Sequence, residues 1–203
     1  MNADEILKSE DFRRCVEFHG HICPGLAIGY RAAKEGLERL HETRARDEEL
    51  VAIVENDACG VDAVQVLTGC TFGKGNFIYK DHGKQVFTFL GRRSKKGVRL
   101  AKRADVSRPN RERDELYKKI RDDTASPKEQ KRFQELHLQR TREILDRPAD
   151  ELFSVRFVDL ALPPKAVIEP PIPCDGCGEP TMASRLTEEN GRKVCGDCQE
   201  KRL

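Results

Sequence analysis

Four cysteines near the C-terminus have the residue type and spacing of a metal site. They form two Cys-x2-Cys pairs, Cys174 with Cys177 and Cys195 with Cys198, and 17 residues separate the pairs. Two residues between paired thiolates let a tight turn direct both sulfurs at one ion, and this doubled spacing is typical of tetrahedral zinc sites. Four thiolates leave no coordination position for water. We therefore expect one zinc ion with a structural role.

The segment that carries these cysteines is too short to fold around apolar side chains alone, so the metal would supply the missing stability. The alternative is four unmetallated thiols or a redox pair. The run Cys-Asp-Gly-Cys-Gly-Glu-Pro, followed by Ser184-Arg185-Leu186 and Cys-Gly-Asp-Cys-Gln, resembles the zinc finger of the DksA/TraR type. In that family the finger accompanies binding to RNA polymerase. The acidic coiled-coil tip of that family has no counterpart here, so the resemblance implies only the zinc site.

A second group of metal-competent residues lies near the N-terminus. His19, His21 and Cys23 alternate along the chain, and an extended backbone would direct alternate side chains to one side. Cys59 precedes a predicted helix, and Cys23 precedes another that begins at Pro24, so the positive end of a helix would favour a thiolate at both. A site with mixed nitrogen and sulfur ligands suits zinc or iron and can leave a position open for substrate.

Three further side chains lie close to these ligands in the sequence. Asp57 and Asp62 are candidate proton carriers or partners of a ligand, or else caps of the helix after Cys59. Cys70 is a resolving thiol or a further ligand, although core packing is the simpler interpretation. If the site is catalytic, the metal would act as a Lewis acid or activate water, and Cys59, His21 and Asp62 are the predicted catalytic residues. The competing interpretation makes the histidines and cysteines hydrogen-bonded or packed structural residues.

Helical and strand patterns surround each of these candidates. Apolar residues recur at helical spacing from Asp4 to Phe18 and from Pro24 to about His41. The run Leu50–Val54 is uninterrupted and rich in β-branched residues, which predicts a central strand buried on both faces. A short helix is expected over Val61–Thr68. The candidate ligands would therefore lie at the ends of predicted helices.

Four more segments have strand character. Asn76–Lys80 and Gln85–Leu90 flank residues 81–84, which have the composition of a hairpin turn. Val98–Ala101 and Ser154–Leu160 complete the set. Together with the helices, these segments predict an α+β fold in which a mixed or antiparallel sheet packs against helices.

The second half of the chain predicts an unusual helical segment and a linker. Residues 108–146 predict two charged helices broken near Ser126, whose thin apolar faces would lie across the surface or project to a partner. Five prolines in residues 163–173 predict a stiff linker. The expected domains are a core at 1–162, this linker, and a zinc finger at 174–203. The helical pair and the linked finger also suggest a homodimer.

Composition restricts the class of protein. The 203 residues are 35% charged and 37% hydrophobic. No segment approaches the roughly 20 apolar residues that span a bilayer, and the acidic start lacks the features of a signal peptide. We therefore expect a cytoplasmic protein without membrane contact. In that reducing compartment, the eight cysteines favour metal binding or thiolate chemistry over disulfides.

Charge suggests an alternative function. Residues 92–121 hold 13 Lys and Arg against four Asp and Glu, a net charge of +9 within a chain of +2. Such a segment is either a solvated face or a contact for nucleic acid or an acidic protein. The alternative to a metal-dependent protein is thus a zinc-finger binding module without catalysis. The aromatic content of 6%, with no Trp, disfavours single-strand stacking.

Three runs of sequence resemble the FmdE family, which takes its name from formylmethanofuran dehydrogenase, over roughly residues 10–105. They are His19-Gly-His-Ile-Cys-Pro-Gly-Leu-Ala-Ile-Gly-Tyr-Arg-Ala-Ala, Glu55-Asn-Asp-Ala-Cys-Gly-Val-Asp-Ala-Val-Gln and Thr68-Gly-Cys-Thr-Phe-Gly-Lys-Gly-Asn. The resemblance implies an α+β fold, and a C-terminal zinc finger also occurs in members of that family. It further implies association with the other subunits of the molybdenum or tungsten oxidoreductase that reduces carbon dioxide onto methanofuran.

Residue by residue, the resemblance implies a core site at His19, His21, Cys23 and Cys59, with Asp62 and Cys70 nearby. The sequence contains no closely spaced cysteines for iron–sulfur clusters and no glycine-rich nucleotide motif. We therefore expect an accessory subunit or a metal-dependent enzyme of one-carbon or redox metabolism, not the catalytic subunit. The expected cofactors are one structural zinc ion and a second transition metal, zinc or iron, in the core site.

Overall fold

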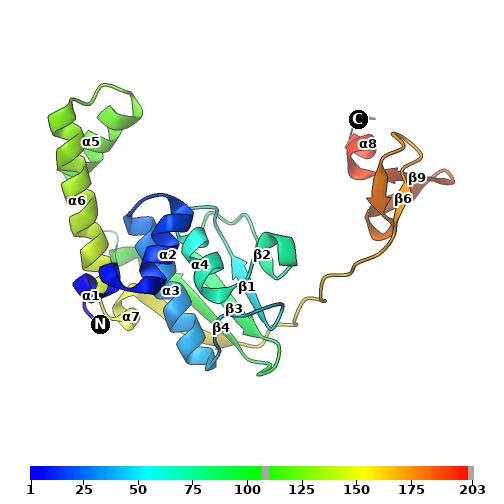
Figure 1. The fold of residues 1–203 in the computed structure, drawn as a ribbon, viewed down its shortest axis with the longest axis horizontal. Coiled ribbons are helices and arrows are strands. Elements are labelled where there is room, and N and C mark those ends of the chain that lie inside the picture. Colours follow the sequence, from blue (N-terminus) through cyan, green and yellow to red (C-terminus); the bar gives the residue numbers. More distant parts are fainter. Residues whose placement is uncertain (107–109, 201–203) are drawn as a thin grey trace. The chain divides into compact units, whose positions relative to one another are not determined.

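The computed structural model describes residues 1–106 and 110–200, which form two compact units, Met1–Lys165 and Ala166–Leu203. The first unit is a sheet covered by helices, and the second is small and built from short strands (Figure 1). This confirms the predicted α+β class. Within the described part of the chain, no helix combines the length and apolar character needed to cross a membrane.

The first unit is built on a five-stranded mixed sheet with the order β2-β1-β3-β4-β5. β1 pairs in parallel with β2, and the other neighbours are antiparallel. The strands are β1 (Leu50–Val54), β2 (Phe77–Tyr79), β3 (Val86–Gly91), β4 (Gly97–Lys102) and β5 (Phe153–Val158).

One prediction about this sheet is wrong. The segments on either side of residues 81–84 do not form a hairpin, because β1 lies between β2 and β3 and pairs with both. The apolar run of β1 outcompetes the local turn signal, since it is largely buried and needs a neighbour on each edge. The prediction that β1 is a buried strand inside the sheet is confirmed, since it has a neighbour on each edge. β3, all of whose residues are buried, occupies the middle position.

Helices α3 and α4 cover one face of the sheet, and α2 packs against both of them (Figure 1). Their core contacts include an edge-to-face pair between Phe12 and Tyr30, with ring centroids 5.2 Å apart. Phe87 and Phe89 of β3 are fully buried below them. The helices of the first unit are α1 (Ala3–Lys8), α2 (Glu10–His19), α3 (Pro24–Leu40), α4 (Gly60–Thr68), α5 (Arg111–Arg121), α6 (Pro127–Asp146) and α7 (Ala149–Leu152), with short 3-10 turns η1 (Phe72–Lys74) and η2 (Ala104–Val106).

The predicted single helix from Asp4 to Phe18 is two helices. Ser9 has extended backbone angles, and its hydroxyl accepts a hydrogen bond from the Phe12 backbone N–H at 3.3 Å. A serine at this position satisfies a free N–H at the start of α2 and so begins a new helix. The bend brings α1 against α6 and leaves α2 to end at His19.

Two glycines set the close crossing of α3 and α4. A Cβ atom at Gly29 of α3 would overlap the carbonyl group of Gly60 at the start of α4. A Cβ at Gly25 would lie 3.0 Å from Cβ of Cys59. The absence of side chains here lets the two helix backbones approach closely, which brings the start of α3 next to the start of α4.

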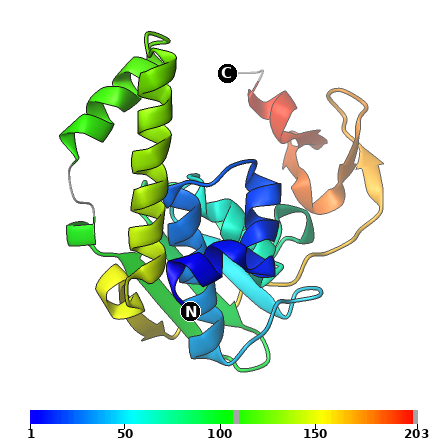
Figure 2. The same cartoon turned by 60° about the vertical axis from the view of Figure 1, so that its left-hand side comes forward.

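Helices α5 and α6 form an arm that extends beyond the sheet (Figures 1 and 2). The predicted break at Ser126 is confirmed: this residue and Glu129 form a reciprocal capping box, and a proline occupies the first turn of α6. The predicted helical start at residues 108 and 109 lies outside the described residues. Among the described residues of α5 only Leu116 is buried, which matches the thin apolar face expected from the sequence.

In its described residues, 166–200, the second unit has short paired strands and a short helix. β6 pairs with β7, and β8 pairs with β9, each in antiparallel register. The elements are β6 (Pro171–Pro173), β7 (Pro180–Met182), η3 (Ala183–Arg185), β8 (Leu186–Glu189), β9 (Arg192–Cys195) and α8 (Gly196–Glu200).

Candidate functional site

The segment that ends α2 and begins α3 carries three of the predicted ligands. His19 is the last residue of α2, and Gly20 follows with a φ of 94°, a left-handed conformation that glycine adopts without strain. Cys23 then caps α3, and its sulfur accepts a hydrogen bond from the Leu26 backbone N–H at 3.3 Å. The predicted extended backbone is therefore wrong for this segment, because the left-handed turn after α2 brings the ligands together.

The three side chains nevertheless converge. One ligand atom from each of His19, His21 and Cys23 lies within 4.8 Å of the other two. The two imidazole rings are 4.4 Å apart between centroids, and the sulfur of Cys23 lies 3.7 Å from Nε2 of His19. His21 is exposed while Cys23 is buried. The cluster therefore has one side open to solvent, as a site with a free coordination position requires.

Asp62 orients the first histidine. One of its carboxylate oxygens lies 2.7 Å from Nδ1 of His19, and the side chains are 33% and 11% exposed, respectively. A carboxylate accepts the proton on Nδ1, which leaves the Nε2 lone pair facing Cys23. Carboxylate–histidine pairs of this kind fix the tautomer and ring orientation of metal-ligating histidines. Asp62 thus lies where the sequence predicted a partner of the site.

Cys59 lies at the edge of the cluster. A Cβ at Gly25 would be 3.5 Å from the Cys59 sulfur and 3.8 Å from that of Cys23, so both thiols flank this glycine. Burial raises the pKa of Cys23 to about 11, against the lowering effect of the Leu26 N–H. The thiolate expected at Cys23, at the start of α3, is therefore not favoured in the metal-free chain, and a metal would have to displace the thiol proton.

The other two candidates do not join the cluster. Asp57 is exposed, and its negative charge is one of the causes, after burial, that raise the pKa of Tyr79. Cys70 is fully buried, its thiol donates to the Leu50 carbonyl at 3.3 Å, and burial raises its pKa to about 11. Its surroundings match the packing interpretation of this cysteine.

The second cluster, in the C-terminal unit, has the dimensions of a tetrahedral sulfur site. The sulfurs of Cys174 and Cys198 are 3.9 Å apart, as are those of Cys177 and Cys195, and all four lie within 4.8 Å of one another. A tetrahedron with zinc–sulfur bonds of about 2.3 Å has sulfur–sulfur edges of about 3.8 Å. The four thiols fit a zinc ion, and they fit any tetrahedral thiophilic metal equally well.

Backbone N–H groups in this cluster stabilise the thiolate form of Cys174. N–H groups of Gly176 and Cys195 donate to the sulfur of Cys174 at 3.3 and 3.2 Å. Hydrogen bonds from the backbone, with Cys177 contributing most, lower the pKa of Cys174 to about 6. A Cβ at Gly176 would lie 2.7 Å from the sulfur of Cys198, so a larger residue in this turn would displace that ligand.

An ionic network around the buried Glu55, at the end of β1, was not predicted from the sequence. The carboxylate of Glu55 bonds Arg99 of β4 at 3.0 Å and Nδ1 of His82 at 3.2 Å. Burial alone would raise the pKa of Glu55, but these two partners outweigh it and leave the pKa below its usual value. Glu55 directly follows the apolar run of β1. A charged residue next to a buried strand could have indicated an ion pair there.

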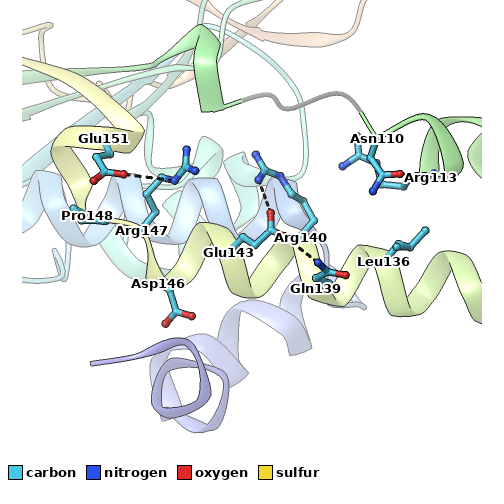
Figure 3. Close-up of a pocket in the computed structure, with 10 residues that line it drawn as sticks. All are labelled: Asn110, Arg113, Leu136, Gln139, Arg140, Glu143, Asp146, Arg147, Pro148 and Glu151. Carbon is cyan, nitrogen blue, oxygen red and sulfur yellow. Dashed lines mark hydrogen bonds and ion pairs between the residues drawn. The ribbon is translucent and has the colours of Figure 1, made fainter.

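A large cavity lies elsewhere, beside the arm. It has a volume of about 620 Å³, and α5, α6 and α7 contribute its lining. Figure 3 shows two ion pairs among the residues that line it: Arg140 with Glu143, and Arg147 with Glu151. None of the cluster residues lines it. The candidate ligands and this cavity therefore do not coincide.

At least seven of the 13 basic side chains in residues 92–121 bond acidic side chains or backbone carbonyls of the same chain. They are Arg92, Arg99, Arg103, Arg111, Arg113, Lys119 and Arg121. Such internal pairing reduces the positive charge that a nucleic acid would meet.

Residues 18–154 match the model of the family described as FmdE, molybdenum formylmethanofuran dehydrogenase operon. The chain belongs to the FmdE family. The match includes the core cluster, strands β1 to β4, the start of β5 and the arm, and it ends before the C-terminal unit. The predicted resemblance is thereby confirmed.

Known proteins that resemble this FmdE-family chain include one sequence relative and one solved structure. A protein of Archaeoglobus fulgidus, described as a probable S-adenosyl-L-methionine-binding protein, is 37% identical over 184 residues, which cover 86% of this chain. The chain spans only about half of that relative, 50% of its length. The crystal structure of a tungsten formylmethanofuran dehydrogenase FmdE-like protein from Syntrophus aciditrophicus matches with a TM-score of 0.62 and 23% identity, over 98% of this chain and 92% of that one. This second likeness establishes a shared fold.

Proposed function

We propose that this chain is a metal-binding protein of one-carbon or redox metabolism, acting as an accessory subunit or a metal-dependent enzyme. In this proposal His19, His21 and Cys23, with Cys59 beside them, hold a zinc or iron ion at an open site, and the four C-terminal cysteines hold a structural zinc ion. The observation that carries the proposal is the convergence of three ligand atoms within 4.8 Å on a side open to solvent.

The residues around the core cluster support a reactive site more than a purely structural one. Asp62 keeps the proton of His19 on Nδ1, so the other nitrogen is free to bind. His21 is exposed, and Phe18 and Ile22 next to the ligands are 60% and 40% exposed. A bound ion would supply a Lewis acid or an activated water at this surface. Cys59 and Asp62 are the side chains available there to take up a proton.

Metal analysis of the full chain tests this proposal. The purified protein is expected to bind two metal equivalents, and the His21→Ala/Cys59→Ala variant to bind one. Cys70→Ala is the matched control, because it removes a buried thiol outside both clusters; it should still bind two. An unchanged stoichiometry in the double variant would refute the core site.

The partners are proposals of the same kind. The FmdE family description names a molybdenum enzyme operon, which supports association with the subunits of such an oxidoreductase. Binding of S-adenosyl-L-methionine is not part of the proposal, because this chain covers half of the Archaeoglobus relative. A homodimer is proposed through the arm, where Tyr117 and Leu138 are 55% and 39% exposed. Sedimentation showing only monomer at micromolar concentration would remove the dimer.

A further inference from the structure

The proposed function does not use the cavity of about 620 Å³ beside the arm. Three arginines line this cavity: Arg113 of α5, Arg140 of α6, and Arg147, which directly follows α6. Figure 3 shows the side chains of Arg140 and Arg147 extending from the same side of α6. Binding sites for small molecules occupy about 300–1,000 Å³. The cavity therefore has room for a small molecule, and its charged lining restricts the class of that molecule.

The sequence of α6 explains why charged groups meet in this cavity. Positions 136, 140, 143 and 147 recur at intervals of three or four residues, so they lie along one face of the helix and its end. The guanidinium of Arg140 donates to the Val106 carbonyl and pairs with Glu143 at 2.7 Å. Arg113 lines the same cavity from α5, which packs on α6. Separate segments thus bring guanidinium groups together.

In the ion pairs of these arginines, the guanidinium is the more buried partner. The side chain of Arg140 is 12% exposed, against 46% for Glu143. The side chain of Arg147 is 19% exposed, against 62% for Glu151. Arg113 is likewise more buried than the carboxylate with which it pairs. A desolvated cation needs an anionic partner, whereas an exposed carboxylate is solvated when it leaves, so a ligand anion can replace these carboxylates.

Two further observations favour an anion in this cavity. The charged atoms of Arg147 and Glu151 are 3.8 Å apart, which exceeds the usual hydrogen-bond length of about 2.7–3.2 Å. Burial lowers the pKa of Lys102 on β4, and the positive charge of Arg140 lowers it further. The same positive charge that disfavours a neighbouring cation favours an anion. Arg147 in particular is held loosely enough to bind one.

We propose that this cavity binds a small, multiply charged oxyanion, carried by a phosphate group or a dicarboxylate. Arg140 and Arg147 bind the anion, Arg113 contributes from α5, and the exposed carboxylates of Glu143 and Glu151 move aside into solvent. The planar fork of a guanidinium matches the oxygens of a carboxylate or phosphate, which suits arginine to this role. The site is independent of the core metal site, since none of the core ligands lines the cavity.

Titrations of the full chain with inorganic phosphate, and separately with succinate, test this proposal by calorimetry at constant ionic strength. Arg147→Gln removes one guanidinium, and Glu151→Gln removes the carboxylate that competes with the ligand. Arg132→Gln is the matched control, because this arginine also lies on α6 and pairs with a glutamate, Glu112, but does not line the cavity. Sodium chloride at the same ionic strength controls for unspecific charge screening.

Arg147→Gln should weaken anion binding about 10-fold, the effect of losing a charged hydrogen bond. Glu151→Gln should strengthen it about 2-fold to 5-fold, because it removes an exposed ion pair that the ligand must break. Arg132→Gln should bind as the wild type does. A purely structural ion pair predicts no such opposite signs. Tighter binding of phosphate or of succinate identifies which of the two groups the natural ligand carries.

Three results would overturn the proposal: no binding of either anion by the wild type, equal weakening in Arg132→Gln, or weaker binding in Glu151→Gln. The His21→Ala/Cys59→Ala variant separates this site from the proposed metal site. It should bind the anion as the wild type does, whether or not it loses a metal equivalent. Loss of anion binding in that variant would place the anion at the core cluster and refute the cavity site.

Discussion

The two candidate metal centres of this chain differ in what holds their ligands in place. In the C-terminal unit, Cys174 and Val194 are the buried apolar residues among those described from residue 166 to 200. The core cluster instead lies at the ends of helices packed over a five-stranded sheet. In the C-terminal unit, a bound metal would therefore hold the fold together. In the core cluster, the fold would hold the ligands in place.

The same contrast appears in the ligands themselves. Four thiols at tetrahedral separations would fill every coordination position of one ion. The core cluster mixes imidazole and thiol groups and has one exposed ligand, with a carboxylate behind another. The first arrangement is suited to stability, and the second to chemistry or exchange. Chelation and substitution should therefore act very differently on the two units.

The largest effect is expected from disrupting the four-cysteine cluster. Replacing Cys174 and Cys198 by serine should unfold the C-terminal unit, because binding free energies of structural zinc are on the order of 10 kcal/mol and little else stabilises this segment. Backbone amide spectra of the full chain would show residues 166–200 collapsing to random-coil positions. Resonances of residues 1–165 should stay in place, and their loss would contradict the independence of the two centres.

The second effect concerns the glycine contact beneath the core cluster. Gly29→Ala should destabilise the first unit by about 3 kcal/mol, because the added methyl overlaps the carbonyl of Gly60 and forces α3 and α4 apart. Chemical denaturation of the metal-free chain measures this. Gly73→Ala is the control, since a Cβ there meets nothing within 4 Å. Equal stability of the two variants would show that the crossing does not position the site.

A third, smaller effect should be confined to metal affinity. Asp62→Asn removes the charge that orients His19 and should weaken metal binding at the core site about 10-fold to 100-fold. Isothermal titration of the metal-depleted chain measures the change. Asp57→Asn, an exposed carboxylate beside the same helix start, should have no effect. The C-terminal site should bind equally well in both variants.

The smallest effect is expected at the ionic network, which involves neither metal. Glu55→Gln should cost about 1 kcal/mol at pH 7, a typical value for a charged hydrogen bond that is partly screened. The pKa of Glu55 is lowered in the folded chain. Its contribution is therefore present above the unfolded pKa and is lost as pH falls through the folded value. The difference between variant and wild type in urea denaturation should shrink on acidification, and a constant difference would exclude this cause.

Much of the fold follows from local patterns in the sequence. The apolar period over Pro24 to Leu40, the β-branched run of β1 and the capping signal at Ser126 each predicted the element that the structure contains. The break at Ser9 could have been predicted, since a serine precedes two acidic residues there. The pairing of β2 and β3 with β1 could not be predicted from the turn between β2 and β3, because it depends on which strand is buried on both faces.

The core site was also predictable in part from local sequence patterns. Alternating His19, His21 and Cys23 pointed to a cluster, although the left-handed turn at Gly20 that joins them was not foreseen. The contacts of Gly29 with Gly60 and of Gly25 with Cys59 depend on helix packing between distant segments. Spacing along the chain carries no such information, because these contacts are set by the tertiary fold.

The most direct test of two independent centres is X-ray absorption at the zinc edge of the full chain with Cys174→Ser and Cys198→Ser, after loading with zinc. If the centres are independent, one zinc equivalent remains, with histidine scattering and one or two sulfur ligands, from His19, His21, Cys23 and Cys59. A variant that retains no zinc, or zinc bound without histidine, would contradict a separate metal site in the core.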